Sequence, residues 1–409
     1  MSRRVVVTGM AGLTSLGNDW DNIREGVAAQ RSGIQRIEEW AKIDGLNTNL
    51  GGPLIDFEVP SHYKRKSVRS MGRVAQLSTT TTERALIEAG LLGDPVISSG
   101  DTGIAYGSSS GSPPAIAEFG AMLHDDSTRT ITATSYIRMM SHTAAVNTGL
   151  FFNIRGRLIS TSTACTSGSQ AIGYAYEAIA HGKQKVMVAG GAEELSSTQA
   201  AVFDILFATS IRNDEPEKTP RPFDRDRDGL VIGEGATTLV LEDLEHAKQR
   251  GAPIIAELIG FATNCDAKHV TQPTAETMEV AMRLALQDAD LDPAAVGYVS
   301  AHGTATDLGD VAESNATNAV FGSKMPISAM KSYFGHTLGA CGAQEVWLTL
   351  EMMNRDEYWP TLNLDNLDPR CGELDYIVNE PRNISTEYVV SNSFAFGGIN
   401  TSLVFKRWA

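Results

Sequence analysis

Cysteine is scarce in this sequence, with only four in 409 residues. The four, Cys165, Cys265, Cys341 and Cys371, are too few and too scattered for a disulfide framework, and none forms a C-x-x-C pair typical of a zinc site. No run of about 18 apolar residues is present, so no membrane-spanning helix is predicted. The N-terminal segment lacks the long apolar stretch of a signal peptide, which favours a cytoplasmic protein.

Positive charge is in deficit. The sequence has 34 Lys and Arg against 49 Asp and Glu, a net charge of −15, which argues against general nucleic-acid binding. A local basic cluster can still attract an acidic partner within a Debye length of about 8–10 Å. The one dense cluster is YKRKSVR at 63–69, for which a solvated charge run is the alternative interpretation.

The spacing of apolar residues indicates alternating strands and helices. In the first part of the chain we expect strands at 3–9, 102–108 and 184–194, helices at 71–91 and 168–182, and an irregular polar segment at 107–140 that covers a site or forms a subunit contact. In the second part we expect a strand at 252–263, another beginning at 296, two within 388–407, and helices at 276–291 and 335–353. Strand, helix and strand in succession are typical of βαβ units with parallel strands. The sequence therefore predicts an α/β protein with two similar halves, 1–250 and 251–409.

Cys165 lies in the segment STACTSGSQAIG, among small residues and just before a predicted helix. Small residues let the backbone turn sharply and let a substrate approach, and the free N–H groups of a helix N-terminus would stabilise a thiolate. An inert cysteine in a tightly packed helix is the commoner alternative. This segment alone does not separate the two interpretations.

Two histidines in glycine-rich loops favour the reactive cysteine. His302 follows a predicted strand in SAHGTATDLGD, and His336 opens a predicted helix in KSYFGHTLGACG. A histidine in such a loop is poorly suited to core packing, although a capping or structural role is the alternative for each one alone. Together with Cys165 they predict a catalytic site. The remaining histidines lack such settings and are expected at the surface or in structural roles: His62, His124, His142, His181, His246 and His269.

From end to end, the sequence resembles the β-ketoacyl-[acyl carrier protein] synthases, the elongating condensing enzymes of fatty acid and polyketide synthesis. The resemblance rests on STACTSGSQAIG, MVAGGAEE, RPFDRDRDGLVIGEGA, AHGTATDLGD, KSYFGHTLGACGAQE and SNSFAFGGIN. It implies the thiolase fold, two βαβαβαββ halves in five layers, α-β-α-β-α. It also implies a homodimer, or a heterodimer with a related subunit. The implied partner is acyl carrier protein, which presents substrates on its phosphopantetheine arm with no further cofactor.

The resemblance also implies a reaction, the decarboxylative condensation of an acyl thioester with malonyl carrier protein. Cys165 would take the acyl group as a low-pKa thiolate. The backbone N–H groups of Cys165 and Phe396 would form the oxyanion hole, and Phe396 would also act as a gate. His302 and His336, each neutral with a proton on Nε2, would hydrogen-bond the malonyl thioester carbonyl as negative charge develops on it.

Lys331 completes the expected catalytic set, in which it orders the site by pairing with Glu313. Asp310 and Glu313 match supporting positions of the family, and Asp310 is expected to have a structural role in the His302 loop. Thr304 and Thr306 are expected to contact the phosphopantetheine arm.

A docking patch for an acidic carrier protein is expected from four basic residues: Arg65, Lys66, Arg69 and Arg129. In relatives, a structural cation can lie at the positions of Glu345, Ser391 and Asn392. Ser300 stands where relatives of that site often have asparagine, so no metal is predicted.

Three departures from the family pattern concern the substrate. Asp307 replaces the proline of the HGTxTP loop, Ala395 replaces the glycine before the gate, and Ile399 replaces a threonine. Added methyl groups beside a mobile gate restrict its backbone or reshape the acyl pocket. We therefore expect an acyl substrate outside the ordinary saturated series, as in a dedicated polyketide or aryl polyene pathway.

Two other functions use the same fold. A non-catalytic chain-length-factor subunit typically lacks the nucleophilic cysteine, which is present here as Cys165. A thiolase, which uses free coenzyme A, has a histidine and second-cysteine arrangement that this sequence does not match.

Overall fold

The computed structural model describes residues 2–408. Its strands are β1 (Val5–Leu13), β2 (Gln35–Arg36), β3 (Leu50–Gly52), β4 (Thr102–Gly107), β5 (Leu158–Thr161), β6 (Val186–Glu193), β7 (Ile232–Gly233), β8 (Gly235–Asp243), β9 (Ala256–Cys265), β10 (Val296–Ser300), β11 (Pro326–Ser328), β12 (Glu357–Tyr358), β13 (Asp375–Tyr376), β14 (Arg382–Asn383), β15 (Tyr388–Ala395) and β16 (Ile399–Arg407). Its α-helices are α1 (Trp20–Ala28), α2 (Arg65–Val68), α3 (Arg73–Glu88), α4 (Pro113–Asp125), α5 (Ser135–Met139), α6 (Thr143–Phe152), α7 (Ser167–Ala180), α8 (Ser197–Ile205), α9 (Leu244–Gln249), α10 (Ala275–Asp288), α11 (Asp307–Phe321), α12 (Lys331–Phe334) and α13 (Cys341–Arg355). Short 3₁₀ turns include η3 (Thr128–Thr130) and η6 (Leu338–Ala340).

The main sheet has 11 strands in the order β13-β11-β10-β15-β16-β9-β1-β8-β6-β4-β5. Its two parts repeat one another: the first half of the chain pairs in the order β5-β4-β6-β8-β1, and the second half in the equivalent order β11-β10-β15-β16-β9. The strand directions also agree. β4 is parallel to β5 and β6, as β10 is to β11 and β15, and β8 and β16 are antiparallel to both of their neighbours. The predicted duplication of an α/β design is confirmed, whereas the boundary at residue 250 stays a prediction.

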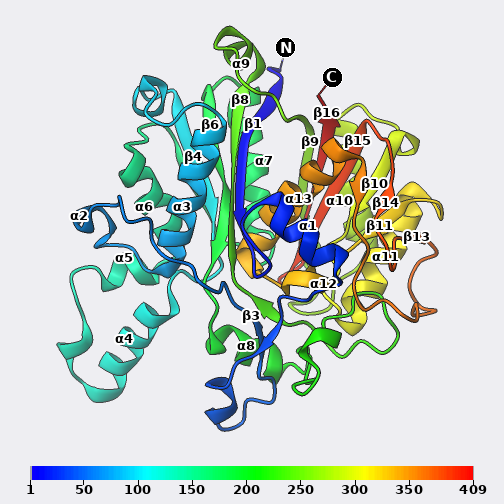
Figure 1. The fold of residues 1–409 in the computed structure, drawn as a ribbon, viewed down its shortest axis with the longest axis horizontal. Helices are drawn as coiled ribbons and strands as arrows, with labels where there is room; N and C mark the ends of the chain where they lie inside the picture. Colours follow the sequence, from blue (N-terminus) through cyan, green and yellow to red (C-terminus); the bar gives the residue numbers. More distant parts are fainter. Residues whose placement is uncertain (1, 409) are drawn as a thin grey trace.

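Helices divide the molecule into five layers (Figure 1). α3 and α6 cover one side of the first-half strands, and α10, backed by α11, covers the far side of the second-half strands. α7 and α13 lie in the middle, where they contact each other and strands of both halves. Among residues 2–408, the two groups of strands join only where Val5–Val7 of β1 pair with Ala256–Leu258 of β9.

Small residues allow the middle layer to pack closely. A Cβ atom on Gly173 of α7 would lie 2.2 Å from the ring of Phe261 in β9, and one on Gly168 would lie 2.9 Å from the carbonyl oxygen of Gly339. The run of small residues after Cys165 therefore lets α7 approach both the second-half sheet and the turn before α13.

Some elements differ from the sequence-based expectation. The segment 107–140, expected to be irregular, contains α4 and α5, which contact each other. β9 begins at Ala256, because Ala252 and Ile254 instead pack with Val6 and α9. The strand β8 and the helix α11 were not predicted, although both are largely buried.

Within residues 2–408, no helix is both long and apolar enough to cross a membrane, as the sequence predicted.

Packing between α7 and β9 can be tested with Gly173→Ala. The added methyl group meets the Phe261 ring, so we expect the free energy of unfolding to fall by about 1–3 kcal/mol despite alanine's better helix propensity. Urea unfolding followed by circular dichroism measures the change. Gly120→Ala in α4 is the matched control: nothing lies within 4 Å of its added Cβ, so it should gain roughly 0.5–1 kcal/mol. Equal effects of the two substitutions would contradict the packing argument.

Candidate active site

Three of the predicted catalytic residues meet in one buried site, and Lys331 adjoins them. Cys165 lies just before α7, His302 follows β10, and His336 lies between α12 and η6. Each is at most 5% exposed, and all three line a cavity of about 540 Å³. The Nε2 atom of His336 is 2.9 Å from the Sγ atom of Cys165, and the two imidazole rings lie 5.3 Å apart, edge to face. The structure therefore brings the predicted catalytic residues together.

Hydrogen bonds to Nδ1 define the tautomers of both histidines. The backbone N–H of Leu338 donates to Nδ1 of His336 (3.2 Å), and the Lys331 ammonium donates to Nδ1 of His302 (3.1 Å). Each neutral ring must therefore carry its proton on Nε2. Burial and the positive charge of Lys331 lower the pKa of both histidines well below the usual value, so they are neutral donors, in agreement with the predicted tautomer.

Lys331 pairs with a different acid from the one predicted. Its ammonium forms a buried ion pair with Glu345 of α13 and donates to the His302 carbonyl oxygen (2.6 Å). Glu313 instead accepts the backbone N–H groups of His302 (2.6 Å) and Gly303 (2.7 Å). The predicted Lys331–Glu313 pair is wrong because α11 presents Glu313 to the loop backbone, while α13 presents Glu345 to the ammonium.

The Cys165 thiol differs from the expected low-pKa thiolate. Burial raises its pKa to about 12, against the opposing effect of the Lys331 charge. The backbone N–H groups of Phe396 and Cys165 also favour the thiolate, but they do not outweigh the loss of water. The thiol is thus protonated at rest in this structure, and the expectation of a resting thiolate is wrong.

Donors for a developing oxyanion surround the sulfur. The N–H groups of Phe396 and Cys165 both act on Sγ, so both lie near the place where an acyl oxygen would develop charge, and the oxyanion hole itself stays a prediction. The ring of Phe396 is half-buried against Phe203 of α8, with centroids 4.9 Å apart. Both rings line the cavity next to Cys165, where the predicted gate would stand. An acyl group bound to the sulfur would therefore have apolar walls beside it.

The predicted arm-binding loop lies at the same cavity. Thr304 and Thr306 line it, and their hydroxyl groups are 2.9 Å apart. Asp310 holds this loop, because its carboxylate accepts the N–H groups of Ala305 (3.0 Å) and Phe223 (2.7 Å). Burial raises the pKa of Asp310 to about 6.

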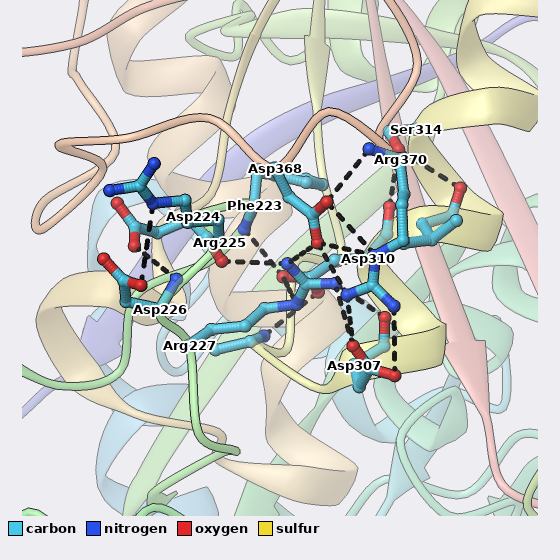
Figure 2. Close-up of polar contacts among 12 residues, drawn as sticks. Phe223, Asp224, Arg225, Asp226, Arg227, Asp307, Asp310, Ser314, Asp368 and Arg370 are labelled. Atoms are coloured by element: carbon cyan, nitrogen blue, oxygen red, sulfur yellow. Dashed lines mark hydrogen bonds and ion pairs between the residues drawn. The ribbon is translucent and has the colours of Figure 1, made fainter.

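Sequence reasoning missed Arg227, which joins three segments around this loop (Figure 2). Its buried guanidinium donates to the Asp368 carboxylate (2.7 Å) and to the carbonyl oxygens of Thr306 (3.1 Å) and Asp307 (2.7 Å). Arg370 bridges the carboxylates of Asp307 (2.5 Å) and Asp368 (2.8 Å). The departure from proline at position 307 thus adds a carboxylate at the start of α11 that takes part in this network. The motif RPFDRDRDG, which contains Arg227, was the available signal.

The predicted docking residues lie at the surface of the first half. Arg65 and Lys66 are in α2, Arg69 follows α2, and Arg129 is in η3. All four are exposed, and within residues 2–408 none of them forms an ion pair. Their positive charges are therefore available to an acidic partner. Of the histidines expected outside the site, His269 is exposed at the mouth of the cavity, and His246 pairs with Glu242 (2.7 Å).

In the described part of the chain, two groups of three side chains are close enough to hold a metal ion: Cys165 with His302 and His336, and His302 with Cys341 and Glu345. In the second group, the Lys331 ammonium already contacts His302 Nδ1 and Glu345, so its positive charge disfavours a cation there. In the first group, the Nε2 atom of His336 carries a proton that faces the Sγ atom of Cys165, so this nitrogen has no lone pair to offer a metal ion.

The oxygen atoms expected at the family's cation position suit such an ion better. Oε2 of Glu345, Oδ1 of Asn392 and Oγ of Ser300 are buried without a hydrogen-bond partner among the described residues. Ser300, the last residue of β10, pairs in register with Ser391 in the middle of β15. Oxygen donors of this kind match the ligands of a hard cation, but the Lys331 ammonium already pairs with Glu345, and its charge disfavours a second cation beside it. The absence of a metal stays a prediction.

Two family models match the chain: "Beta-ketoacyl synthase, N-terminal domain" over residues 2–247 and "Beta-ketoacyl synthase, C-terminal domain" over residues 255–365. The chain is 38% identical over 414 residues to 3-oxoacyl-[acyl-carrier-protein] synthase 2 of Vibrio harveyi, covering 100% of this chain and 99% of the relative. Among solved structures it is similar to a β-ketoacyl synthase of Burkholderia phymatum, with 59% identity, a TM-score of 0.98 and full coverage of both chains. A ketosynthase in complex with its chain length factor from Xenorhabdus doucetiae has 27% identity and a TM-score of 0.84, over 99% of this chain and 98% of the other.

The ionisation of Cys165 can be tested by alkylation with iodoacetamide. Below its pKa, the thiolate fraction of a thiol grows tenfold for each pH unit, so a pKa of about 12 predicts an alkylation rate that still rises steeply near pH 10. Glutathione, an ordinary thiol, should level off above about pH 9. Peptide mass spectrometry, with Cys165→Ser as the control, assigns the label to Cys165. A plateau below pH 8 would show a resting thiolate and contradict this assignment.

Proposed function

The chain belongs to the β-ketoacyl synthase family, and we propose that it condenses an acyl thioester with malonyl-[acyl carrier protein], releasing CO₂ and a 3-oxoacyl-[acyl carrier protein] during chain elongation. It is thus an acyl-transferring ketosynthase. One observation carries the proposal: a buried cysteine 2.9 Å from the Nε2 atom of a neutral histidine, with a second neutral histidine alongside.

The first half-reaction is acyl transfer to Cys165. Sγ attacks the carbonyl carbon of the acyl thioester, the carbon–sulfur bond to the carrier arm breaks, and the thiol proton ends on the released carrier thiol. The N–H groups of Cys165 and Phe396 stabilise the oxyanion of the tetrahedral intermediate. Thr304 and Thr306 hold the phosphopantetheine arm, and no further cofactor is required.

The second half-reaction is decarboxylation and condensation. Loss of CO₂ from the malonyl group moves an electron pair toward the thioester oxygen, where the Nε2–H groups of His302 and His336 donate hydrogen bonds. The resulting carbanion attacks the acyl carbonyl carbon, and Cys165 leaves as a thiolate. Neutral histidines suit this step because a donor is required and no proton transfer to the ring is needed. Lys331 keeps His302 in the donating tautomer.

A non-catalytic chain-length factor is the alternative function. The contact between Cys165 and His336, with His302 at the same cavity, argues against it, because a partner subunit needs no such arrangement.

We also propose that the chain forms a homodimer through the free edge of β5. Within residues 2–408, β5 pairs only with β4, and Leu158 of β5 is 46% exposed. Leu150 of α6, the helix that packs on β5, is 73% exposed, so apolar surface continues beside this edge. A second copy of the chain packed against this edge would cover the unpaired backbone N–H and C=O groups of β5. Sedimentation velocity should give a dimer for the purified chain. A monomer that dimerises only with a related subunit would support the heterodimer instead.

The unusual acyl substrate stays a prediction. Ala395 is half-buried and packs in the apolar cluster around Cys165, which is consistent with an effect on the acyl pocket. Mass spectrometry of products formed from saturated, polyunsaturated and aryl-primed carriers would show the preference, and faster turnover of the saturated chains would contradict it.

The two half-reactions can be separated by substitution. His302→Ala removes a donor needed only in the second half-reaction, so we expect Cys165 to be acylated while condensation slows on the order of 10²–10³-fold. Cys165→Ala should form no acyl-enzyme but retain some malonyl decarboxylation. Intact-protein mass spectrometry and CO₂ release measure the two steps, and circular dichroism controls for folding. Equal loss of both steps in both variants would show that the roles are wrongly assigned.

Docking of the carrier can be tested by charge reversal at Lys66 and Arg69. Lys66→Glu with Arg69→Glu should raise KM for carrier-bound substrates and weaken the dependence of kcat/KM on salt, because the exposed positive patch attracts an acidic partner. Lys324→Glu is the matched control, since Lys324 is exposed beside β11, far from α2 (Figure 1). Unchanged kinetics of the double variant, or an equal effect of Lys324→Glu, would place the docking surface elsewhere.

A further inference from the structure

Glu193, the last residue of β6, is a fully buried carboxylate that the steps above do not use. Its Oε2 atom accepts the backbone N–H groups of Ser109 (2.8 Å) and Gly339 (2.9 Å), together with the Ser109 hydroxyl (2.6 Å). Its Oε1 atom accepts the side-chain amide of Gln199 (3.3 Å) and lies 3.3 Å from the hydroxyls of Ser108 and Ser110. Within residues 2–408, no Lys, Arg or His forms an ion pair with it. Hydrogen bonds from neutral groups therefore replace the missing counter-charge.

These bonds join three segments that are distant in the sequence. Gly339 belongs to η6 beside His336, Ser109 belongs to the loop after β4, and Gln199 lies in α8, one turn before Phe203. Phe203 in turn packs on Phe396. One carboxylate thus ties the His336 loop to the loop after β4 and to the helix beside the gate.

The His336 loop needs such an anchor because its backbone is strained. Leu338 has a φ of +44°, a left-handed conformation that is costly for leucine, and its N–H donates to Nδ1 of His336. Gly339 follows it directly, and a Cβ atom there would lie 2.7 Å from Oε2 of Glu193. The bond from Gly339 to Glu193 therefore holds the peptide that directly follows the one whose N–H orients the His336 ring.

The charge of Glu193 also reaches the nucleophile. Burial is the main cause of the raised pKa of Cys165, and Glu193 adds a small effect in the same direction, opposed by Lys331 and by the N–H groups of Phe396 and Cys165. The neutral side chains His336, His302 and Cys341 complete the surroundings of the thiol. A change of charge at Glu193 should consequently be detectable at Cys165 even without a substrate.

We propose that Glu193 is a positioning residue for the condensation: its carboxylate holds the His336 loop in the register that points Nε2–H at the reacting thioester. The proposal rests on the proposed function. It assigns Glu193 no contact with the substrate; the residue acts through the backbone of Gly339 and the ring of His336.

Two conservative substitutions separate the reach of the side chain from its charge. Glu193→Asp keeps the charge but is one methylene shorter, so it cannot bond both Ser109 and Gly339. Glu193→Gln keeps the length and can still accept from both backbone N–H groups. The new side-chain NH₂ group would face Gln199. The Oε1 atom of Gln199 is buried without a hydrogen-bond partner, and a turn of the Gln199 amide would let this oxygen accept from the new NH₂ group. Folding of the glutamine variant is thus supported by the structure.

The matched control is Glu194→Gln. Glu194 is the next residue and is also buried, but its carboxylate accepts from Ser112 (2.6 Å) and makes no bond to the His336 loop. The substitution therefore removes a buried carboxylate from the residue that directly follows the proposed anchor. A general effect of neutralising a buried acid here would appear in both glutamine variants.

The experiment compares the three variants with the unsubstituted protein in condensation, acylation of Cys165 and the pH profile of Cys165 alkylation. We expect Glu193→Asp to slow condensation by about tenfold to a hundredfold, as for a misplaced catalytic group, with acylation little changed and the alkylation profile in place. We expect Glu193→Gln to condense within a few-fold of the unsubstituted protein, with its alkylation profile moved to lower pH. Glu194→Gln should leave condensation unchanged.

Three results would overturn the proposal. The first is full condensation activity of Glu193→Asp, and the second is an equal loss of acylation and condensation in that variant. The third is a loss of condensation in Glu194→Gln as large as the loss in Glu193→Asp. An unmoved alkylation profile in Glu193→Gln would refute the link to the thiol. Alkylation needs no carrier or malonyl group, so it reports on Glu193 even if the unsubstituted protein does not condense these substrates. Failure of the unsubstituted protein to condense these substrates would count against the proposed function and not against the role of Glu193.

Discussion

The starts of α7 and α13 pack against each other in the middle layer, and the catalytic site depends on this contact. The two helices occupy equivalent places in the duplicated halves, so Cys165 before α7 and the His336 loop before α13 approach from opposite sides. The thiol of Cys341 donates to the carbonyl oxygen of Cys165 (3.3 Å), and Gly168 leaves room for the Gly339 carbonyl. Larger side chains at these points would separate the helices and lengthen the distance from Cys165 to His336.

The same packing excludes water, and this determines the ionisation of the site. Without water, each charge must be paired, hydrogen-bonded or neutralised, so Lys331 lies against Glu345, and both histidines stay neutral. The thiol of Cys165 is likewise protonated. A neutral, preorganised set of donors suits a reaction in which negative charge forms on the substrate and must be met by hydrogen bonds already in place.

Backbone strain accompanies each catalytic residue. Ala164, Ala305 and Leu338 have φ values of +49°, +63° and +44°, although none is glycine. Each such residue costs about 1–3 kcal/mol and persists only where its surroundings hold it. The N–H of Ala305 donates to buried Asp310, and Gly339, next to Leu338, donates to buried Glu193. Buried carboxylates therefore serve as backbone anchors on both sides of the site.

Local patterns in the sequence were sufficient to predict two similar α/β halves and to select Cys165, His302 and His336, because strand and helix periodicities and glycine-rich loops are properties of neighbouring residues. The helices α4 and α5 were missed because the serines and glycines before α4, the prolines at its start, and the serine and threonines between the two helices indicated an irregular segment. Only the tertiary structure decided that Lys331 pairs with Glu345, because acids on two helices were available and packing presents just one of them to the ammonium. It also decided that the Cys165 thiol is protonated, since a pKa depends on how much water distant segments exclude, and no local pattern records that.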